Sequence, residues 1–171
     1  MNYVPLRVIA STALVVGALL GMAGTFVPSA SLRGLAWGID GVALVVASSL
    51  LTVHYFRSGH DLVAAGFMVF AIGEGLVLSG AAMDPAASTP SFGSGVGLWA
   101  ASLALISAPR VMPTWVRGIG FIASALFALV AIQIFVGRPL TPLSAPMPFF
   151  AYPFLAVTIF GWAWSHLRER A

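Results

Sequence analysis

Two acidic residues, Asp40 and Glu74, lie inside long apolar stretches of the sequence. A carboxylate near the centre of a membrane-spanning helix costs about 2.5 kcal/mol or more to insert, so a partner or a function is expected. At 1.5 Å per residue, Asp40 lies about 9 Å and Glu74 about 14 Å from the same end of two consecutive predicted helices. Because these helices form a hairpin, both carboxylates are expected in the same half of the membrane, within reach of each other.

The neighbours of both acids favour positions inside a helical bundle. Asp40 shares its helical face with the small residues Ala36 and Ala43, which allow a second helix to pack closely. Glu74 has a glycine on either side, so its backbone is open to another helix, a water molecule or an ion. Both side chains are therefore expected to face protein rather than lipid.

This arrangement supports two hypotheses. In the functional one, Asp40 and Glu74 bind a proton, a cation or a small solute, and Gln133 near the same end of a later helix joins them. In the structural one, the two acids hydrogen-bond each other and fix the register of their helices.

The three histidines are expected at the opposite face of the membrane. His54 and His166 end predicted helices, and His60 lies in the turn that follows His54. A pair of helical histidines can ligate a b-type haem, and the cluster with Asp61 and Glu169 offers nitrogen and oxygen ligands to a metal. Histidines at the head-group level are more often interfacial residues of amphipathic helix ends. We interpret all three in this way and expect no bound cofactor, with haem or metal as the alternative.

Several kinds of chemistry have no support in the sequence. The chain has no cysteine, which excludes disulfides, zinc–thiolate sites, iron–sulfur clusters and cysteine nucleophiles. It has no HExxH sequence, no GxSxG sequence and no glycine-rich phosphate loop. We therefore expect a protein that is not an enzyme.

The composition places the chain in a lipid bilayer. Hydrophobic residues make up 60% of its 171 positions and charged residues only 8%, whereas soluble domains have about 45–50% and about 25%. The net charge is +3, and the basic residues are single, scattered arginines. This pattern excludes a soluble enzyme and gives no sign of a nucleic-acid partner.

Six apolar stretches are each long enough to span a membrane as a helix of about 20 residues. They predict a single all-α, membrane-embedded domain over residues 1–171, with spans at 8–28, 34–56, 62–83, 92–109, 116–136 and 149–166. The proline-rich segment 138–148 is expected to lie extended along the rim of the bundle. The polar loop 84–94 is either a lid over Glu74 or an ordinary connector.

The arginines predict the orientation of the six spans. With the N-terminus in the cytoplasm, only Arg33 and Arg138 face outward, and the other six arginines face inward, as the positive-inside rule requires. Both termini are then cytoplasmic, in a multi-pass protein of a bacterial-type inner membrane. Aromatic residues near predicted helix ends are expected at the membrane interfaces: Trp115, Trp162, Trp164, Tyr55 and Tyr152.

The first helix carries the close-packing pattern Gly17-x-x-x-Gly21. It predicts either a homodimer contact or packing against the second helix of the same chain. For the whole protein, the leading hypothesis is a transporter-like or channel-like protein that binds or passes a small solute or ion. The alternatives are an accessory subunit bound to another membrane protein and, third, a haem-bearing redox protein.

Overall fold

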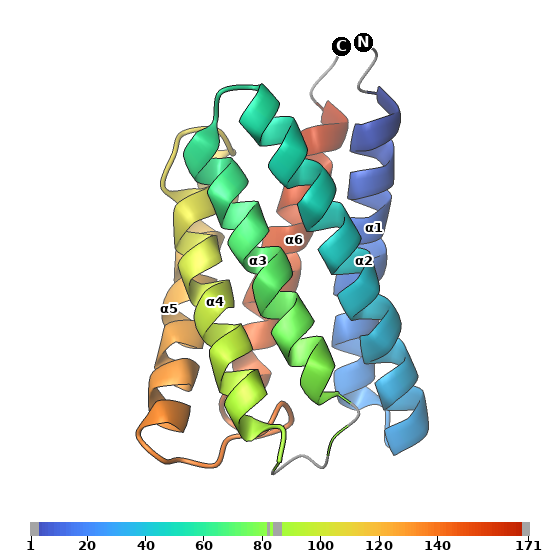
Figure 1. The fold of residues 1–171 in the computed structure, drawn as a ribbon, viewed down its shortest axis with the longest axis vertical. Coiled ribbons are helices and arrows are strands. Elements are labelled where there is room, and N and C mark those ends of the chain that lie inside the picture. Colours follow the sequence, from blue (N-terminus) through green and yellow to red (C-terminus); the bar gives the residue numbers. More distant parts are fainter. Residues whose placement is uncertain (1–3, 82, 84–86, 169–171) are drawn as a thin grey trace.

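The structure is a computed structural model that describes residues 4–81, 83 and 87–168. Within these residues the chain forms helices and turns and no strand, which confirms the all-α prediction. Six α-helices stand side by side (Figure 1). They are α1 (Val4–Phe26), α2 (Ala30–Arg57), α3 (Asp61–Gly80), α4 (Thr89–Ser107), α5 (Thr114–Phe135) and α6 (Tyr152–Arg168), with a short 3-10 helix, η1 (Phe149–Ala151), before α6.

The helices form a closed ring in sequence order. Each helix packs against the next one along the chain, and α6 packs against both α5 and α1. Both ends of the chain lie at the same end of the bundle (Figure 1). We call this the terminal end; the α2–α3 and α4–α5 turns lie there too. The three other connections lie at the opposite end, which we call the loop end.

Local sequence signals explain where the helices begin and end. The Ser29 hydroxyl caps α2 by accepting a hydrogen bond from the Leu32 amide at 3.4 Å. Pro90 occupies the first turn of α4, where a missing amide hydrogen costs nothing. After α2 and α5 the backbone reverses at Gly59 (φ 75°) and Gly137 (φ 92°), a conformation that glycine adopts without strain.

Every predicted span overlaps one observed helix, but two boundaries change the depths of the acids. Because Ser29 caps α2, this helix begins at Ala30 rather than at 34, and Asp40 lies about 15 Å from its start. Helix α3 ends at Gly80 rather than at 83, so Glu74 lies about 9 Å from its end. Both carboxylates remain in the loop-end half of the ring.

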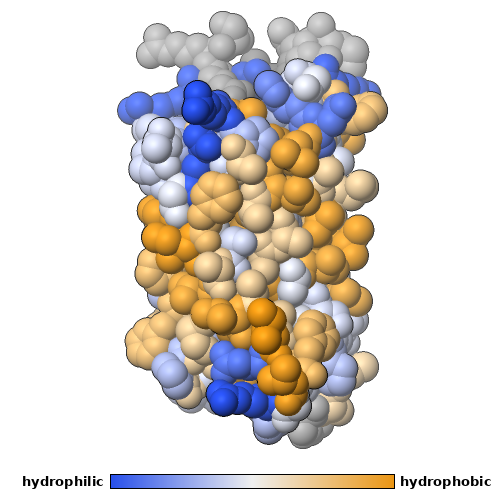
Figure 2. Space-filling view, turned by 90° about the vertical axis from the view of Figure 1, so that its left-hand side faces the viewer, coloured by the Kyte–Doolittle hydropathy of each residue, from blue (hydrophilic) through white to orange (hydrophobic). Residues whose placement is uncertain are grey.

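Four helices are long and apolar enough to cross a membrane: α1, α2, α3 and α5. Their outward faces carry large apolar side chains, such as Leu19 (55% exposed) on α1 and Ile72 (53% exposed) on α3. Figure 2 shows a broad apolar band on one face, with hydrophilic residues gathered at both ends of the molecule. A side-chain distribution of this kind suits a lipid environment.

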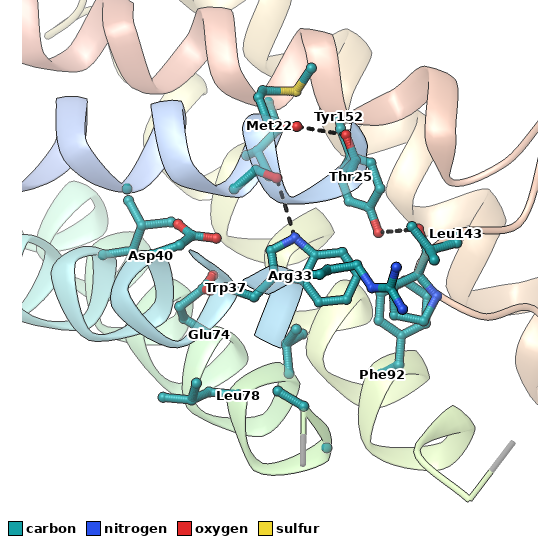
Figure 3. Close-up of a pocket in the computed structure, with 18 of the residues that line it drawn as sticks. Met22, Thr25, Arg33, Trp37, Asp40, Glu74, Leu78, Phe92, Leu143 and Tyr152 are labelled. Atoms are coloured by element: carbon teal, nitrogen blue, oxygen red, sulfur yellow. Dashed lines mark hydrogen bonds between the residues drawn. The ribbon is translucent and has the colours of Figure 1, made fainter. Parts of the chain in front are cut away.

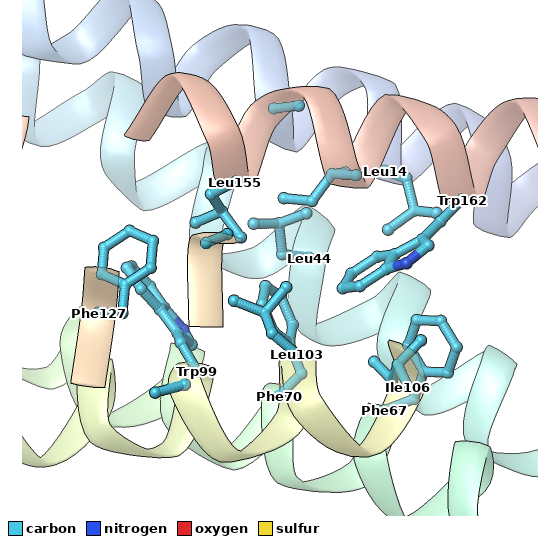
Figure 4. Packing of buried hydrophobic residues seen from close by; sticks show 14 of the residues in the cluster. Leu14, Leu44, Phe67, Phe70, Trp99, Leu103, Ile106, Phe127, Leu155 and Trp162 are labelled. Atoms are coloured by element: carbon cyan, nitrogen blue, oxygen red, sulfur yellow. The ribbon is translucent and has the colours of Figure 1, made fainter. Parts of the chain in front are cut away.

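The middle of the ring is filled by aromatic and aliphatic side chains (Figure 4). The Trp162 ring meets Phe67 and Phe70 edge to face, with centroids 5.1 and 5.7 Å apart. Toward the loop end, Trp99 stacks on Phe70 and meets Phe127 edge to face. Such aromatic pairs add about 0.5–1.5 kcal/mol each beyond the area they bury.

The prediction of an aromatic belt is wrong for two of its residues. Trp162 and Tyr55 are fully buried, at 0% and 2% exposure, because they point into the ring instead of lying at its edge. Trp115 and Trp164 are exposed at 46% and 39%, and their rings lie 5.9 Å apart near the terminal end. Distance from a helix end alone does not distinguish an inward-facing ring from an outward-facing one.

Candidate functional site

A cavity of about 290 Å³ opens inside the loop-end half of the ring. Side chains from α1, α2, α3, α4 and α6 line it, together with residues 141–143 of the connection between α5 and α6. Asp40 and Glu74 both face it (Figure 3). The cavity therefore joins residues that are far apart in the sequence around the two acids that the sequence singled out.

Glycines on α1 make room for the Asp40 side chain. A Cβ atom at Gly21 would lie 2.6 Å from Asp40 Oδ2, and one at Gly17 would lie 2.5 Å from the Leu44 side chain. At Gly24, a Cβ atom would meet the Trp37 ring at 2.5 Å. The glycine face of α1 thus packs on α2 of the same chain, which confirms the intrachain alternative for this motif.

Glu74 is held by an equally close approach of α3 and α4. A Cβ atom at Gly73 would lie 3.0 Å from the carbonyl oxygen of Gly95, so the two helices cross with their backbones almost in contact. This crossing buries Glu74, which is only 3% exposed. The Trp99 indole N–H of α4 lies beside the Glu74 carboxylate but does not meet hydrogen-bond geometry.

The two carboxylates point toward each other across the base of the cavity (Figure 3). Asp40 Oδ1 and Glu74 Oε2 are buried, and neither has a hydrogen-bond partner. An unpartnered buried polar atom costs about 1–3 kcal/mol, and more when it is charged. The structural hypothesis expects these oxygens to be paired in the folded protein. In the structure these two oxygens instead have no partner, and the residues that carry them line the cavity.

Arg33 is the one basic residue among the described residues that line the cavity. Its Nη1 donates a hydrogen bond to the Val27 carbonyl at 3.2 Å, and its guanidinium carbon lies 5.7 Å from the centre of the Trp37 ring. Arg33 precedes Asp40 by about two helical turns, or about 10 Å along α2. It therefore lies at the rim of the cavity, while the carboxylates lie at its base.

The connection between α5 and α6 covers part of the cavity. The Tyr152 hydroxyl donates a hydrogen bond to the Pro142 carbonyl at 3.0 Å, and Pro142 and its neighbours line the cavity. The segment lies at the rim of the cavity, but the prediction that it is extended is wrong, because residues 142–143 and 145–148 form turns. In the predicted loop 84–94, residues 84–86 lie outside the described part of the chain, and α4 already begins at Thr89. Ser88 of this segment and Phe92 in the first turn of α4 line the cavity.

The ring interior between the cavity and the terminal end is filled mainly by apolar side chains, with a few buried polar ones such as Ser11 and Ser48 among them. One turn from Gly17 toward that end, α1 contributes Leu14; at the same level α3 contributes Phe70 and α6 contributes Trp162. All three side chains are fully buried in one continuous core (Figure 4). The carboxylates are thus close to the loop end and separated from the terminal end by a packed, mostly apolar core.

Gln133 does not join the two acids. It lies on α5, which contributes no described residue to the cavity lining. Its side-chain amide donates to the Leu129 carbonyl at 3.2 Å, and its carbonyl oxygen accepts a hydrogen bond from Arg138 at 3.2 Å. Gln133 shares the loop end with Asp40 and Glu74 but belongs to a different face of the ring.

Two of the three histidines meet at the terminal end. The rings of His54 and His166 lie 6.2 Å apart. His166 Nε2 bonds the Tyr55 hydroxyl at 2.8 Å, and its Nδ1 bonds the carbonyl of Trp162. Both ring nitrogens of His166 are therefore engaged within the protein, and axial ligation of an iron would require one of these bonds to break.

The third histidine does not complete a metal site. His60 lies in the turn before α3, with its ring 6.1 Å from that of Tyr55. Among residues 4–81, 83 and 87–168, no group of three or more His, Cys, Asp or Glu side chains could hold a metal ion. Glu169, a candidate ligand in the sequence, lies outside these residues. The described contacts at this end favour a structural role for His166.

The cavity also contains residues that the sequence hypothesis did not include. Arg33, Trp37, Asp40 and Leu44 recur at helical spacing on one face of α2, and this period of three to four residues was the available signal. No comparable pattern in the sequence pointed to Trp99, because its position beside Glu74 depends on the crossing of α3 and α4.

The chain matches no protein family model, no curated protein and no solved structure. The functional interpretation of the cavity therefore depends on its own residues and their geometry.

Proposed function

We propose that this protein is a membrane-embedded, transporter-like or channel-like protein that binds a small solute or ion in the loop-end cavity. Asp40 and Glu74 are its binding residues. The observation that carries the proposal is the pair of facing carboxylates, each with a buried oxygen that has no hydrogen-bond partner. Ionisable residues within membrane spans are costly and rare, and those that face a cavity mark substrate and ion pathways.

Electrostatics explain what such a pair does. Two like charges in a site of low dielectric constant repel each other, and a proton or a cation between them removes the repulsion. Arg33 is held at the rim by Val27 and Trp37, so the base of the cavity keeps its acidic character. The site therefore selects for positive charge.

The proposed topology gives the cavity a direction. In a bacterial-type inner membrane, all six helices span the bilayer and the terminal end faces the cytoplasm, where Arg57, Arg110, Arg117 and Arg168 then lie. The cavity opens to the outside, and the packed core around Trp162 separates it from the cytoplasm. Passage through the protein requires this core to open, whereas binding from outside does not.

Proton flux into proteoliposomes tests this function. Under an imposed membrane potential, a pH-sensitive dye inside the vesicles should report a flux with the wild-type protein. Asp40→Asn and Glu74→Gln should each reduce this flux to the level of protein-free vesicles, because each removes a charge and keeps the shape. Asp61→Asn is the matched control, since Asp61 is an exposed acid at the terminal end and its substitution should leave the flux unchanged.

The opposite result would contradict the proposal. If both variants insert and fold like the wild type and retain its flux, the two acids are structural. Equal thermal unfolding of the three variants in detergent verifies that the comparison concerns function and not folding.

A further inference from the structure

We propose that the ligand of this cavity is a small organic cation with an apolar body, of the size of one aromatic ring with a quaternary or protonated amine. This inference rests on the proposed function, because it uses Asp40 and Glu74 as the binding residues. It adds the chemical class of the ligand, which follows from the charge, the lining and the volume of the cavity.

The acidic residues of the cavity determine that its ligand is positively charged. Two carboxylates face the base, and the guanidinium of Arg33 lies at the rim with its hydrogen bond already directed to Val27. Glu74 is 97% buried and lines the cavity, and its Oε2 is a buried acceptor without a hydrogen-bond partner. A cationic head group that reaches the base gains attraction from both acids.

The lining offers too few free oxygen atoms to coordinate a bare divalent metal ion. Hard divalent cations require about six or more oxygen ligands. The Thr25 hydroxyl donates to the Met22 carbonyl at 2.7 Å, and the Tyr152 hydroxyl donates to the Pro142 carbonyl at 3.0 Å (Figure 3). Beyond the two carboxylates, little oxygen remains to replace the hydration shell of a metal ion.

The rest of the lining suits an apolar, cationic molecule. Trp37, Phe92, Trp99 and Tyr152 contribute aromatic side chains to the cavity lining. Aromatic faces attract ammonium groups, and cages of such rings recognise quaternary ammonium ligands. Aliphatic side chains of α2, α3 and α6 complete the walls. The lining therefore offers contact area to a hydrocarbon body and a negative base to its head group.

The volume sets the size of the ligand. A cavity of about 150 Å³ accommodates benzene, as engineered examples show. The 290 Å³ present here gives room for one ring and a trimethylammonium head, and lies at the lower end of the range for ligand pockets.

Two molecules of nearly the same shape test the inference. Phenyltrimethylammonium is a permanent cation, and tert-butylbenzene is its neutral isostere. Their binding to the full chain in lipid nanodiscs is measured by titration, with empty nanodiscs as the blank. We expect the cation to bind at least about tenfold more tightly than the neutral molecule, which corresponds to about 1.4 kcal/mol.

The variants separate the head group from the body. Asp40→Asn and Glu74→Gln should each weaken binding of the cation by about tenfold or more and change binding of tert-butylbenzene little. Asp61→Asn should bind both probes like the wild type. Arg33→Gln removes a like charge at the rim and should strengthen binding of the cation by roughly twofold or more. A gain of affinity cannot result from misfolding.

Two outcomes would overturn the inference. Equal affinities for the two molecules, or cation binding that is insensitive to both acids, would show that charge does not select the ligand. If proton flux depends on Asp40 and Glu74 but phenyltrimethylammonium does not bind, the ligand class is wrong and the proposed function stands. If neither the proton flux nor the binding of the cation depends on the two acids, the proposed function and the proposed ligand class are both wrong.

Discussion

At the scale of single residues, the position of the Asp40 carboxylate depends on a glycine of another helix. The place where Gly21 would carry a Cβ atom is 2.6 Å from Asp40 Oδ2. The sequence predicted that Asp40 and Glu74 share one half of the bundle, because hairpin geometry follows from helix lengths. It could not predict that Gln133 lies elsewhere, because its face of α5 depends on how the ring closes.

Gly21→Ala should therefore displace the Asp40 side chain. We expect a loss of phenyltrimethylammonium affinity of about tenfold, because the added methyl group would lie only 2.6 Å from Oδ2 and force the carboxylate to move. The measurement is the same titration in nanodiscs, accompanied by thermal unfolding. Gly38→Ala is the matched control: it lies in α2 with nothing within 4 Å of the added atom and should bind like the wild type. Unchanged affinity in Gly21→Ala would show that Asp40 tolerates displacement.

At the scale of elements, the crossing of α3 and α4 places Glu74. A Cβ atom at Gly95 would lie 2.8 Å from the Gly73 carbonyl oxygen and 2.4 Å from the Val77 side chain. The six helices and their approximate bounds follow from hydropathy, prolines and capping residues such as Ser29. The close crossing of α3 and α4 cannot be predicted in this way, because glycines also occur at exposed positions such as Gly75. Only the partner helix shows which glycines are contacts.

Gly95→Ala should destabilise the bundle. The added methyl group meets the backbone of Gly73, which cannot rotate away, and overpacking of this kind costs about 1–3 kcal/mol. The expected result is a lower thermal unfolding midpoint in detergent. Gly118→Ala, on the open side of α5, gains helix propensity without a new contact and should unfold at or above the wild-type midpoint. Equal midpoints for the two variants would contradict the close crossing.

At the scale of the whole molecule, the ring separates its two ends. The acids and the cavity belong to the loop end, the His166 contacts belong to the terminal end, and packed side chains around Trp162 lie between them. The arginine distribution predicted which residues share an end, and the structure places the described ones accordingly (Figure 1). The sequence did not predict that the loop-end half contains a cavity and that the other half is packed, since both depend on how side chains from five helices meet.

Accessibility of single cysteines tests the proposed topology. The natural chain has no cysteine, so Ala108→Cys at the terminal end and Ala87→Cys at the loop end each introduce one exposed label site. In intact bacterial cells, a membrane-impermeant maleimide should label Ala87→Cys, and Ala108→Cys only after lysis. Labelling of both positions in intact cells would contradict the six-span arrangement.

Native mass spectrometry addresses the alternative of an accessory subunit. A protein that binds its ligand alone should leave its membrane as a monomer or homo-oligomer after gentle extraction. Stoichiometric mass from other polypeptides would instead assign the protein to a larger complex, and the cavity would then have to be considered together with that partner.

Infrared difference spectroscopy tests the central claim most directly, because it observes the carboxyl groups themselves. Spectra of the protein with and without phenyltrimethylammonium are compared for the wild type, Asp40→Asn, Glu74→Gln and Asp61→Asn. The account predicts a ligand-induced change in carboxyl bands that persists in Asp61→Asn and is lost in the other two variants. A spectrum without carboxyl changes, or one that is identical in all four proteins, would contradict the assignment of Asp40 and Glu74 as the ligand site.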